Sequence, residues 1–343
     1  MNSDDRDDLP HATAKSLKIL GKIREAPEDF RVEEIPAYPA EGEGEHLMVR
    51  FEKVGLDTKV AVDRIARALE VDPREASFAG LKDRKAITTQ WASFHRADPE
   101  RALALTLPEI RILDAQRHRH KLRTGHLQGN RFRIRVRGAS AHLETARELL
   151  DELVRVGVPN YFGEQRFGHE GRNLERARAW LVEGGRAPRG RFERKLLVST
   201  LQSAAFNAWL SARLSRGEFA TAIAGDVMRK EDSGGVFTCD DAQSDQPRVQ
   251  NWEISPTGPV FGPKMRAAEG PAADHEREAL AVLGGDAVLA RLGRLGPGSR
   301  RPARIRPLTP SIEVEGDDLW LDFGLRKGGY ATVLLRELLK QDS

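Results

Sequence analysis

The chain has 343 residues, of which 39% are hydrophobic and 31% are charged, and its length favours two folded domains. Its single cysteine, Cys239, excludes an intrachain disulfide framework and most thiolate metal clusters. No apolar run approaches the roughly 18 residues of a membrane helix. The formal net charge of +3 gives only a weak indication of an anionic partner.

The chain begins with a polar stretch, MNSDDRDDLPHATAKS, that lacks the basic start and apolar core of a signal peptide. This stretch also has too little apolar surface to offset the entropy that is lost when a chain becomes ordered. We therefore expect a cytoplasmic protein without membrane contact, and a disordered tail over about residues 1–16.

The next residues alternate between apolar and polar side chains, as β-strands do. We predict short strands over residues 18–25, 30–34 and 46–55. Asp57 and Thr58 then have the character of a helix start, and apolar residues at helical spacing predict a helix from there to Glu70.

The segment FAGLKDRKAITTQ, residues 78–90, holds a single carboxylate, Asp83, between Lys82, Arg84 and Lys85. Carboxylates are normally ionised at neutral pH and adjacent cations favour the anion, so Asp83 can accept a proton or attack an electrophilic carbon. The ordinary explanation is a loop aspartate in a turn hydrogen bond or a surface ion pair. Two-carboxylate glycoside hydrolysis and metal-assisted phosphodiester cleavage both need more acids than this segment contains.

Residues 115–138 contain eight lysines and arginines and no acidic residue, so positive charge is concentrated there. Every second residue from 131 to 137 is arginine, and a strand would place these four guanidinium groups on one face. Residues 117–123 repeat the pattern. The two strands would form a hairpin around residues 125–129 and present a cationic sheet face.

The middle of the chain is helical. Residues 141–156 predict a helix that ends at Gly157 and Pro159, and two further helical stretches extend to Gly217. After a Gly- and Pro-rich region, strand patterns return in IEVE and LWLDFGL, and a final helix follows a Gly-Gly turn. Strands at both ends and helices between them predict an α+β domain that is interrupted by an inserted, mostly helical one.

Common cofactor and metal signatures are absent from the sequence. Neither the phosphate-binding motif G-x-x-x-x-G-K-[ST] nor the dinucleotide motif G-x-G-x-x-G occurs. His118, His120 and His126 lie in the cationic segment without an HExxH motif or a cysteine partner, which disfavours a bound dication. We therefore expect no metal and no cofactor.

Four segments resemble the TruD family of tRNA pseudouridine synthases and occur in the order of that family. They are FAGLKDRKAITTQ, GNRF at residues 129–132, GVPNYFGEQRFG at residues 157–168, and GGYATVLLREL at residues 328–338. Any one of these matches is weak, but four in order over nearly the whole chain are highly specific.

The resemblance implies an enzyme that isomerises uridine to pseudouridine in RNA, in bacterial members at uridine 13 of tRNA. It places Asp83 at the family's catalytic aspartate, near the ribose C1′ of a flipped-out uridine. The carboxylate either attacks C1′ to form a sugar ester or removes the C2′ proton to give a glycal.

The resemblance also implies the architecture. A discontinuous catalytic domain with a mixed or antiparallel sheet would comprise residues 1–158 and 305–343. A TruD-type insertion over residues 159–304 would form the other wall of an RNA cleft. We expect a monomer that binds tRNA.

Substrate contacts implied by the same resemblance are Phe30, Asn130, Phe132 and Tyr330. An extruded base needs a flat partner to replace its lost stacking, and an amide that reads the uracil edge or fixes the catalytic carboxylate. Without the resemblance, both phenylalanines would be interpreted as core residues. Arg24 stands where bacterial relatives tend to have lysine, which keeps the charge but changes its geometry.

Candidate contacts to RNA phosphates are the basic residues Lys82, Arg84, Lys85, Arg131, Arg133 and Arg166. The segment around Arg166 is equally well explained as an interdomain loop with buried aromatic residues. Two other classes of function stay open. A noncatalytic RNA-binding protein would use the same cationic face with a structural Asp83, and a metal-dependent nuclease would cut RNA and lose activity in EDTA.

Overall fold

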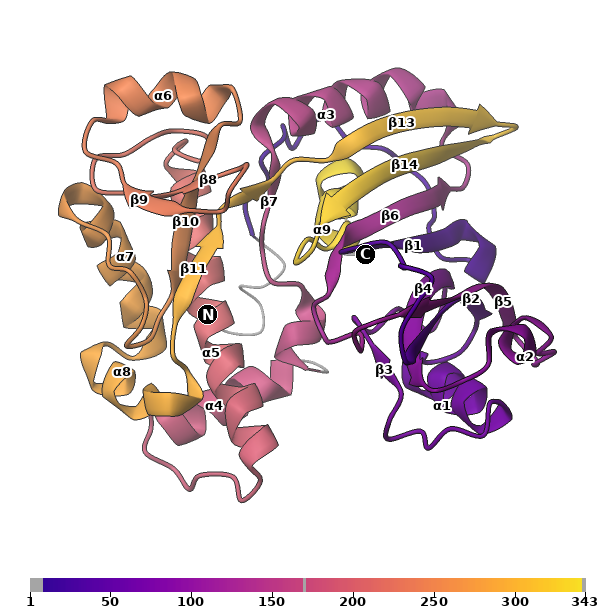
Figure 1. Cartoon of the computed structure of the whole chain (residues 1–343). Helices are drawn as coiled ribbons and strands as arrows, with labels where there is room; N and C mark the ends of the chain where they lie inside the picture. The colour runs from indigo at the N-terminus through magenta and orange to yellow at the C-terminus, as the bar shows by residue number, and fades with distance from the viewer. Residues whose placement is uncertain (1–8, 169–170, 341–343) are drawn as a thin grey trace. The chain divides into compact units, whose positions relative to one another are not determined.

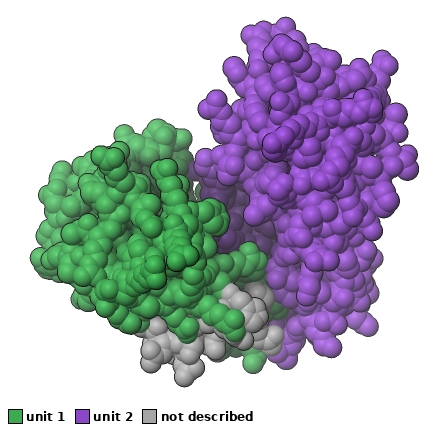
Figure 2. All heavy atoms as spheres, turned by 90° about the horizontal axis from the view of Figure 1, so that it is seen from below, with its two compact units in different colours: residues 1–18, 149–306, 332–343 green, residues 19–148, 307–331 purple. Residues whose placement is uncertain are grey.

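The computed structural model of the protein describes residues 9–168 and 171–340, and its contacts divide the chain into two compact units. Figure 2 colours them separately. Unit 2 consists of Ile19–Glu148 and Pro307–Ala331, and unit 1 of Met1–Lys18, Leu149–Arg306 and Thr332–Ser343. The contacts thus place the unit boundaries after residues 148 and 306, whereas we expected domain boundaries after residues 158 and 304. They also assign the residues from Thr332 onward to unit 1.

Unit 2 is built on a mixed eight-stranded sheet with the order β13-β14-β6-β1-β4-β2-β5, to which β3 adds by pairing with β4 (Figure 1). β1 and β4 are parallel, and the other pairs are antiparallel. The strands are β1 (Phe30–Pro36), β2 (His46–Val54), β3 (Ser77–Phe78), β4 (Ile87–His95), β5 (Ile110–His118), β6 (Leu127–Val136), β13 (Leu308–Glu315) and β14 (Asp318–Arg326).

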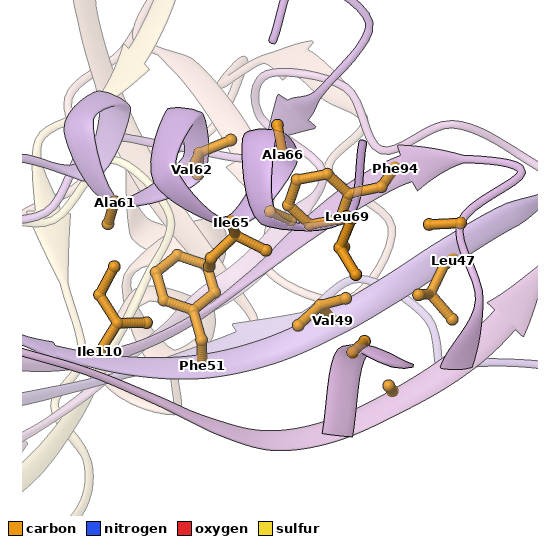
Figure 3. Close-up of a cluster of buried hydrophobic side chains, with 14 residues drawn as sticks. Leu47, Val49, Phe51, Ala61, Val62, Ile65, Ala66, Leu69, Phe94 and Ile110 are labelled. Carbon is orange, nitrogen blue, oxygen red and sulfur yellow. The ribbon is translucent and has the colours of Figure 1, made fainter. Parts of the chain in front are cut away.

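One end of this sheet is covered by α1 (Thr58–Ala68), while the short α2 (Pro99–Leu103) precedes β5. Apolar residues of α1 face alternate residues of β2, such as Val49 and Phe51, in a cluster with β4 and β5 (Figure 3). Burial of each large side chain contributes about 1.5–3 kcal/mol, so this cluster holds the helix on the sheet. The predicted helix from residue 58 and the predicted strands in β1 and β2 are confirmed.

Two strand predictions are wrong. Residues 18–25 form only a single bridge, between Lys22 and Arg137. The two basic strands form no hairpin, because β5 lies at the sheet edge and β6 lies between β14 and β1. Packing of the apolar side chains of β6 favours β1 and β14 as its neighbours, because Phe132 lies in register with Val32 of β1 and with Phe323 of β14.

Unit 1 surrounds the long α5 (Arg191–Ser215), which packs on a four-stranded sheet with the order β11-β10-β8-β9. Gly258 of β10 permits this packing, because a Cβ there would lie 2.3 Å from the Trp209 ring of α5. The strand β10 runs through the Gly- and Pro-rich region, where the sequence predicted none. The strands are β7 (Val158–Pro159), β8 (Val227–Lys230), β9 (Val236–Thr238), β10 (Ile254–Val260), β11 (Ser299–Pro302) and β12 (Arg304–Ile305), which pairs with β7.

The other helices of unit 1 are α4 (Arg172–Leu181), α6 (Ala242–Gln250), α7 (Gly270–Leu283) and α8 (Asp286–Leu292). Two helices continue across the unit boundaries, α3 (Leu143–Val156) and α9 (Ala331–Leu339). Among the helices that the structure describes, none is both long and apolar enough to span a bilayer.

The expected disordered tail is partly ordered. Residues 1–8 lie outside the described residues, but the prediction is wrong for residues 9–16. Thr13 donates hydrogen bonds from its backbone N (3.1 Å) and from Oγ1 (2.8 Å) to the buried Glu337 carboxylate of α9. Burial alone would raise the pKa of Glu337, but hydrogen bonds from His11 and Thr13 and the charges of His11 and Lys340 lower it. A buried carboxylate needs such donors, and the tail supplies them.

Candidate active site

Asp83 lies in the loop between β3 and β4, and its side chain is 29% exposed. Its Oδ1 accepts a hydrogen bond from the Lys85 backbone N at 3.0 Å, which is the local turn expected of a loop aspartate. Its Oδ2 lies 3.7 Å from Nη2 of Arg24. The carboxylate is therefore oriented by its own loop and faces a cation with its second oxygen.

Arg24 connects Asp83 to a group of aromatic rings. Its guanidinium lies 4.5 Å from the centre of the Phe30 ring. Phe30 meets Phe132 edge to face, with 6.3 Å between centroids, and Phe132 stacks on Phe323 at 5.4 Å. The structure thus brings together four residues that the sequence placed in the site. The two rings named as base contacts are only 3% and 7% exposed.

Asn130 belongs to the same face of the sheet. Residues that are paired across neighbouring strands point to the same side, and Asn130 pairs with Glu34 of β1, two positions along the chain from the Phe132–Val32 pair. Its Oδ1 is buried and has no hydrogen-bond partner among the residues that the structure describes. An unsatisfied buried acceptor of this kind is uncommon in folded proteins and marks Asn130 as a candidate for a functional role.

Tyr330 follows the end of β14, whose Leu325 pairs with Asn130. Tyr330 is 36% exposed, so its ring is open to solvent in a way that the rings of Phe30 and Phe132 are not.

Beneath the Asp83 loop, the sheet carries polar residues at positions where its alternation calls for apolar ones. We call Glu34, Lys53, Thr88 and Gln90 the polar floor. All four are almost fully buried, and register places them on one face of β1, β2 and β4. These four residues were not predicted from the sequence, although polar residues at inward-facing strand positions are a signal that the sequence contains.

Lys82, predicted to contact phosphate, belongs to this layer instead. Its Nζ lies 2.6 Å from Oε2 of Glu34, and the two side chains are 5% and 1% exposed. A buried cation that is already paired with a carboxylate is poorly placed to bind a phosphate, so this pairing disfavours a contact that stays a prediction. Arg84 and Lys85 are exposed beside Asp83 and still fit that role.

The arginines of β6 lie on the opposite face from Phe30 and Phe132, because they occupy the alternate positions of the strand. They also do not form the free cationic face that the sequence predicted. Arg133 binds Asp322 and Glu313, Arg135 binds Asp318, and Arg137 binds Asp29. A phosphate contact stays a prediction for Arg131 and Arg133 on that face.

Arg166 lies in unit 1, where its guanidinium is 5.8 Å from the Phe162 ring and its Nε donates to Oγ of Ser203 at 3.4 Å. The predicted contact between Arg166 and RNA stays a prediction.

Lys53 is the charged residue most affected by this environment. Burial lowers its pKa to about 8, although the negative charges of Asp83 and Asp57 oppose the shift. In the unfolded chain Lys53 has its ordinary pKa of 10.5, so it holds its proton at pH values where the folded protein has already released it. The free energy of unfolding of the wild-type protein therefore rises as pH increases from about 8 to 10.5.

We predict that Lys53→Met is more stable than wild type at neutral pH, by about 1–3 kcal/mol, because it removes a buried charge. The advantage should shrink as pH rises through that window. Urea unfolding of both proteins at several pH values measures the difference. Lys59→Met, an exposed change on α1, should show no such pH dependence, and a constant advantage for Lys53→Met would contradict the prediction.

Comparison with known proteins agrees with these observations. The family model described as tRNA pseudouridine synthase D (TruD) matches residues 9–185 and 192–338. A tRNA pseudouridine synthase D of Anaeromyxobacter dehalogenans is 48% identical and covers 98% of both chains. One from Thermus thermophilus is 41% identical, over 97% of this chain and 93% of its own.

The fold has a solved counterpart. A crystal structure described as a tRNA pseudouridine synthase D from Methanosarcina mazei matches with a TM-score of 0.79 at 23% identity, over 98% of each chain. This likeness confirms the predicted α+β class with its mixed sheet.

Proposed function

We propose that this chain, which belongs to the tRNA pseudouridine synthase D (TruD) family, converts uridine to pseudouridine in tRNA, at uridine 13, with Asp83 as the catalytic carboxylate. The observation that carries the proposal is the carboxylate of Asp83, partly exposed and facing the Arg24 guanidinium on the aromatic face of the sheet. A single acid of this kind is what the isomerisation requires.

The reaction needs no redox partner, because product and substrate have the same atoms. The N1–C1′ bond breaks and uracil leaves as an anion, after which the base turns and its C5 bonds to C1′. C5 then loses a proton and N1 gains one. As the nucleophile, Asp83 forms an ester at C1′ that breaks when C5 attacks C1′. As the base, it takes the C2′ proton and returns it to C2′ when C5 bonds to C1′. The charge of Arg24, which lies beside the Asp83 carboxylate, would stabilise the negative charge on the departing base.

Recognition of the base falls to Asn130 and Tyr330. The buried, unpartnered Oδ1 of Asn130 would accept a hydrogen bond from uracil N3–H, a donor that cytosine lacks, once the amide turns toward the base. The exposed ring of Tyr330 would stack on the flipped base. Phe30 packs against the Arg24 guanidinium and Phe132 packs against Phe30, and direct stacking of the base on these two rings stays a prediction.

The test uses purified protein and a tRNA transcript that lacks modifications and carries tritium at C5 of its uridines. We expect tritium release and one mapped pseudouridine at position 13, and no release from a transcript with cytidine at that position. EDTA should have no effect. Tight binding without release would favour the noncatalytic RNA-binding protein, and EDTA-sensitive strand cleavage would favour the nuclease.

Substitutions of Arg24 test its role separately. Arg24→Met removes the charge beside Asp83 and should lower kcat on the order of 10²-fold. Arg24→Lys keeps the charge but loses the flat stacking on Phe30, so we expect kcat within about tenfold of wild type. Single-turnover rates measure both. Equal losses in the two variants would show that the charge is not what Arg24 contributes.

A further inference from the structure

We propose that Lys53 and the Lys82–Glu34 pair are positioning residues. They lie in the polar floor below the loop that carries Asp83, and they hold Asp83 in its reactive position. The proposal rests on the function assigned above. It concerns buried groups that do not touch substrate and act through the main chain of the Asp83 loop.

The first attachment comes from β2. Lys53 is fully buried, and its Nζ donates a hydrogen bond to the backbone carbonyl oxygen of Asp83 at 2.9 Å. Because β2 lies between β4 and β5 inside the sheet, Lys53 joins the catalytic residue to a rigid part of the fold. Because Lys53 contacts the main chain of Asp83, it positions this residue while the side-chain carboxylate stays available for the reaction.

The second attachment comes from β1 through the neighbouring residue. The Lys82 side chain points into the polar floor, where its Nζ lies 2.6 Å from Oε2 of Glu34. A third attachment comes from α1, because the Lys82 backbone N donates to Oγ1 of Thr58 at 2.9 Å. Two consecutive loop residues are thus tied to β1, β2 and α1, and these ties fix both the position and the direction of Asp83.

This arrangement is expensive for stability, which is the reason to assign it a function. Buried ion pairs are often no more stable than apolar residues of the same size, and Lys53 has no carboxylate within the 4.0 Å of an ion pair among the described residues. Thr88 Oγ1 and Gln90 Nε2 in the same floor also lack hydrogen-bond partners in the described part of the chain. Apolar residues on this face would satisfy packing alone, whereas a misplacement of about 1 Å at a reacting group can lower a rate by about 10²-fold.

The experiment replaces the buried charges with apolar groups of similar length. The variants are Lys53→Met and the double variant Glu34→Met with Lys82→Met, which leaves no unpaired charge. Lys59→Met, an exposed change of the same type on α1, is the control. For each protein, kcat, KM, the Kd for unmodified tRNA and the thermal midpoint are measured.

We expect both variants to keep a thermal midpoint equal to or above that of wild type, with unchanged Kd and KM. We expect kcat to fall about tenfold or more in each. The Lys59→Met control should match wild type in all four quantities. A structural role alone would lower the midpoint and leave kcat intact.

The proposal is overturned if folded variants turn over within twofold of wild type, or if KM and Kd rise in proportion to the loss. Should the double variant fail to fold, Thr58→Val removes the acceptor of the Lys82 backbone N with little change of shape and is judged by the same criteria. Failure of the proposed function looks different, because wild-type protein itself would then form no pseudouridine.

Discussion

Replacing Asp83 with asparagine should abolish pseudouridine formation while tRNA binding survives. Asparagine has the same shape, and its Oδ1 still accepts the hydrogen bond from the Lys85 backbone N. It is neither a nucleophile nor a base, so we expect the single-turnover rate to fall on the order of 10³-fold or more. Tritium release measures the rate, and filter binding measures the Kd for tRNA.

The matched control is Asp63→Asn, which neutralises an exposed aspartate on α1 that is paired with Lys59. It should turn over like wild type. Turnover by Asp83→Asn within about tenfold of wild type would refute the catalytic role. Loss of binding together with turnover would show that the carboxylate organises the RNA site rather than the reaction.

The largest effect on stability is expected in unit 1, at the pair formed by Arg213 and Asp226. These side chains are only 1% and 3% exposed, and two hydrogen bonds of 2.9 and 2.7 Å join them. Asp226→Asn leaves a buried guanidinium without its counterion. We expect the free energy of unfolding to fall by about 3–5 kcal/mol, as measured by urea denaturation.

Glu152→Gln is the control for this change, because it removes a carboxylate from an exposed pair with Arg155 and should alter stability by less than about 1 kcal/mol. Arg213 also donates to the backbone carbonyls of Glu218 and Thr221. A loss for Asp226→Asn as small as that of the control would mean that these carbonyls stabilise the guanidinium unaided.

Local patterns in the sequence were sufficient for most elements of the fold. Alternation identified β1, β2, β13 and β14, and helical spacing identified α1, α3 and α5, because these patterns reflect which face of an element is buried. The resemblance to a family picked out Asp83, Arg24 and Phe30, which meet in the structure. A turn-forming aspartate among cations would not have been assigned to catalysis without it.

The sequence by itself determined most of the strands and helices, and its resemblance to a family named the candidate catalytic acid. Only the tertiary structure decided what surrounds that acid. Strand β6 pairs with β1 and β14, with which it shares apolar contacts. Arg133 pairs with Asp322, which is 189 positions away in the chain, so the predicted cationic face is neutralised. Lys82 likewise turned inward to Glu34, 48 positions away. Pairing of this kind depends on contacts between segments that are remote in sequence, and no local periodicity carries that information.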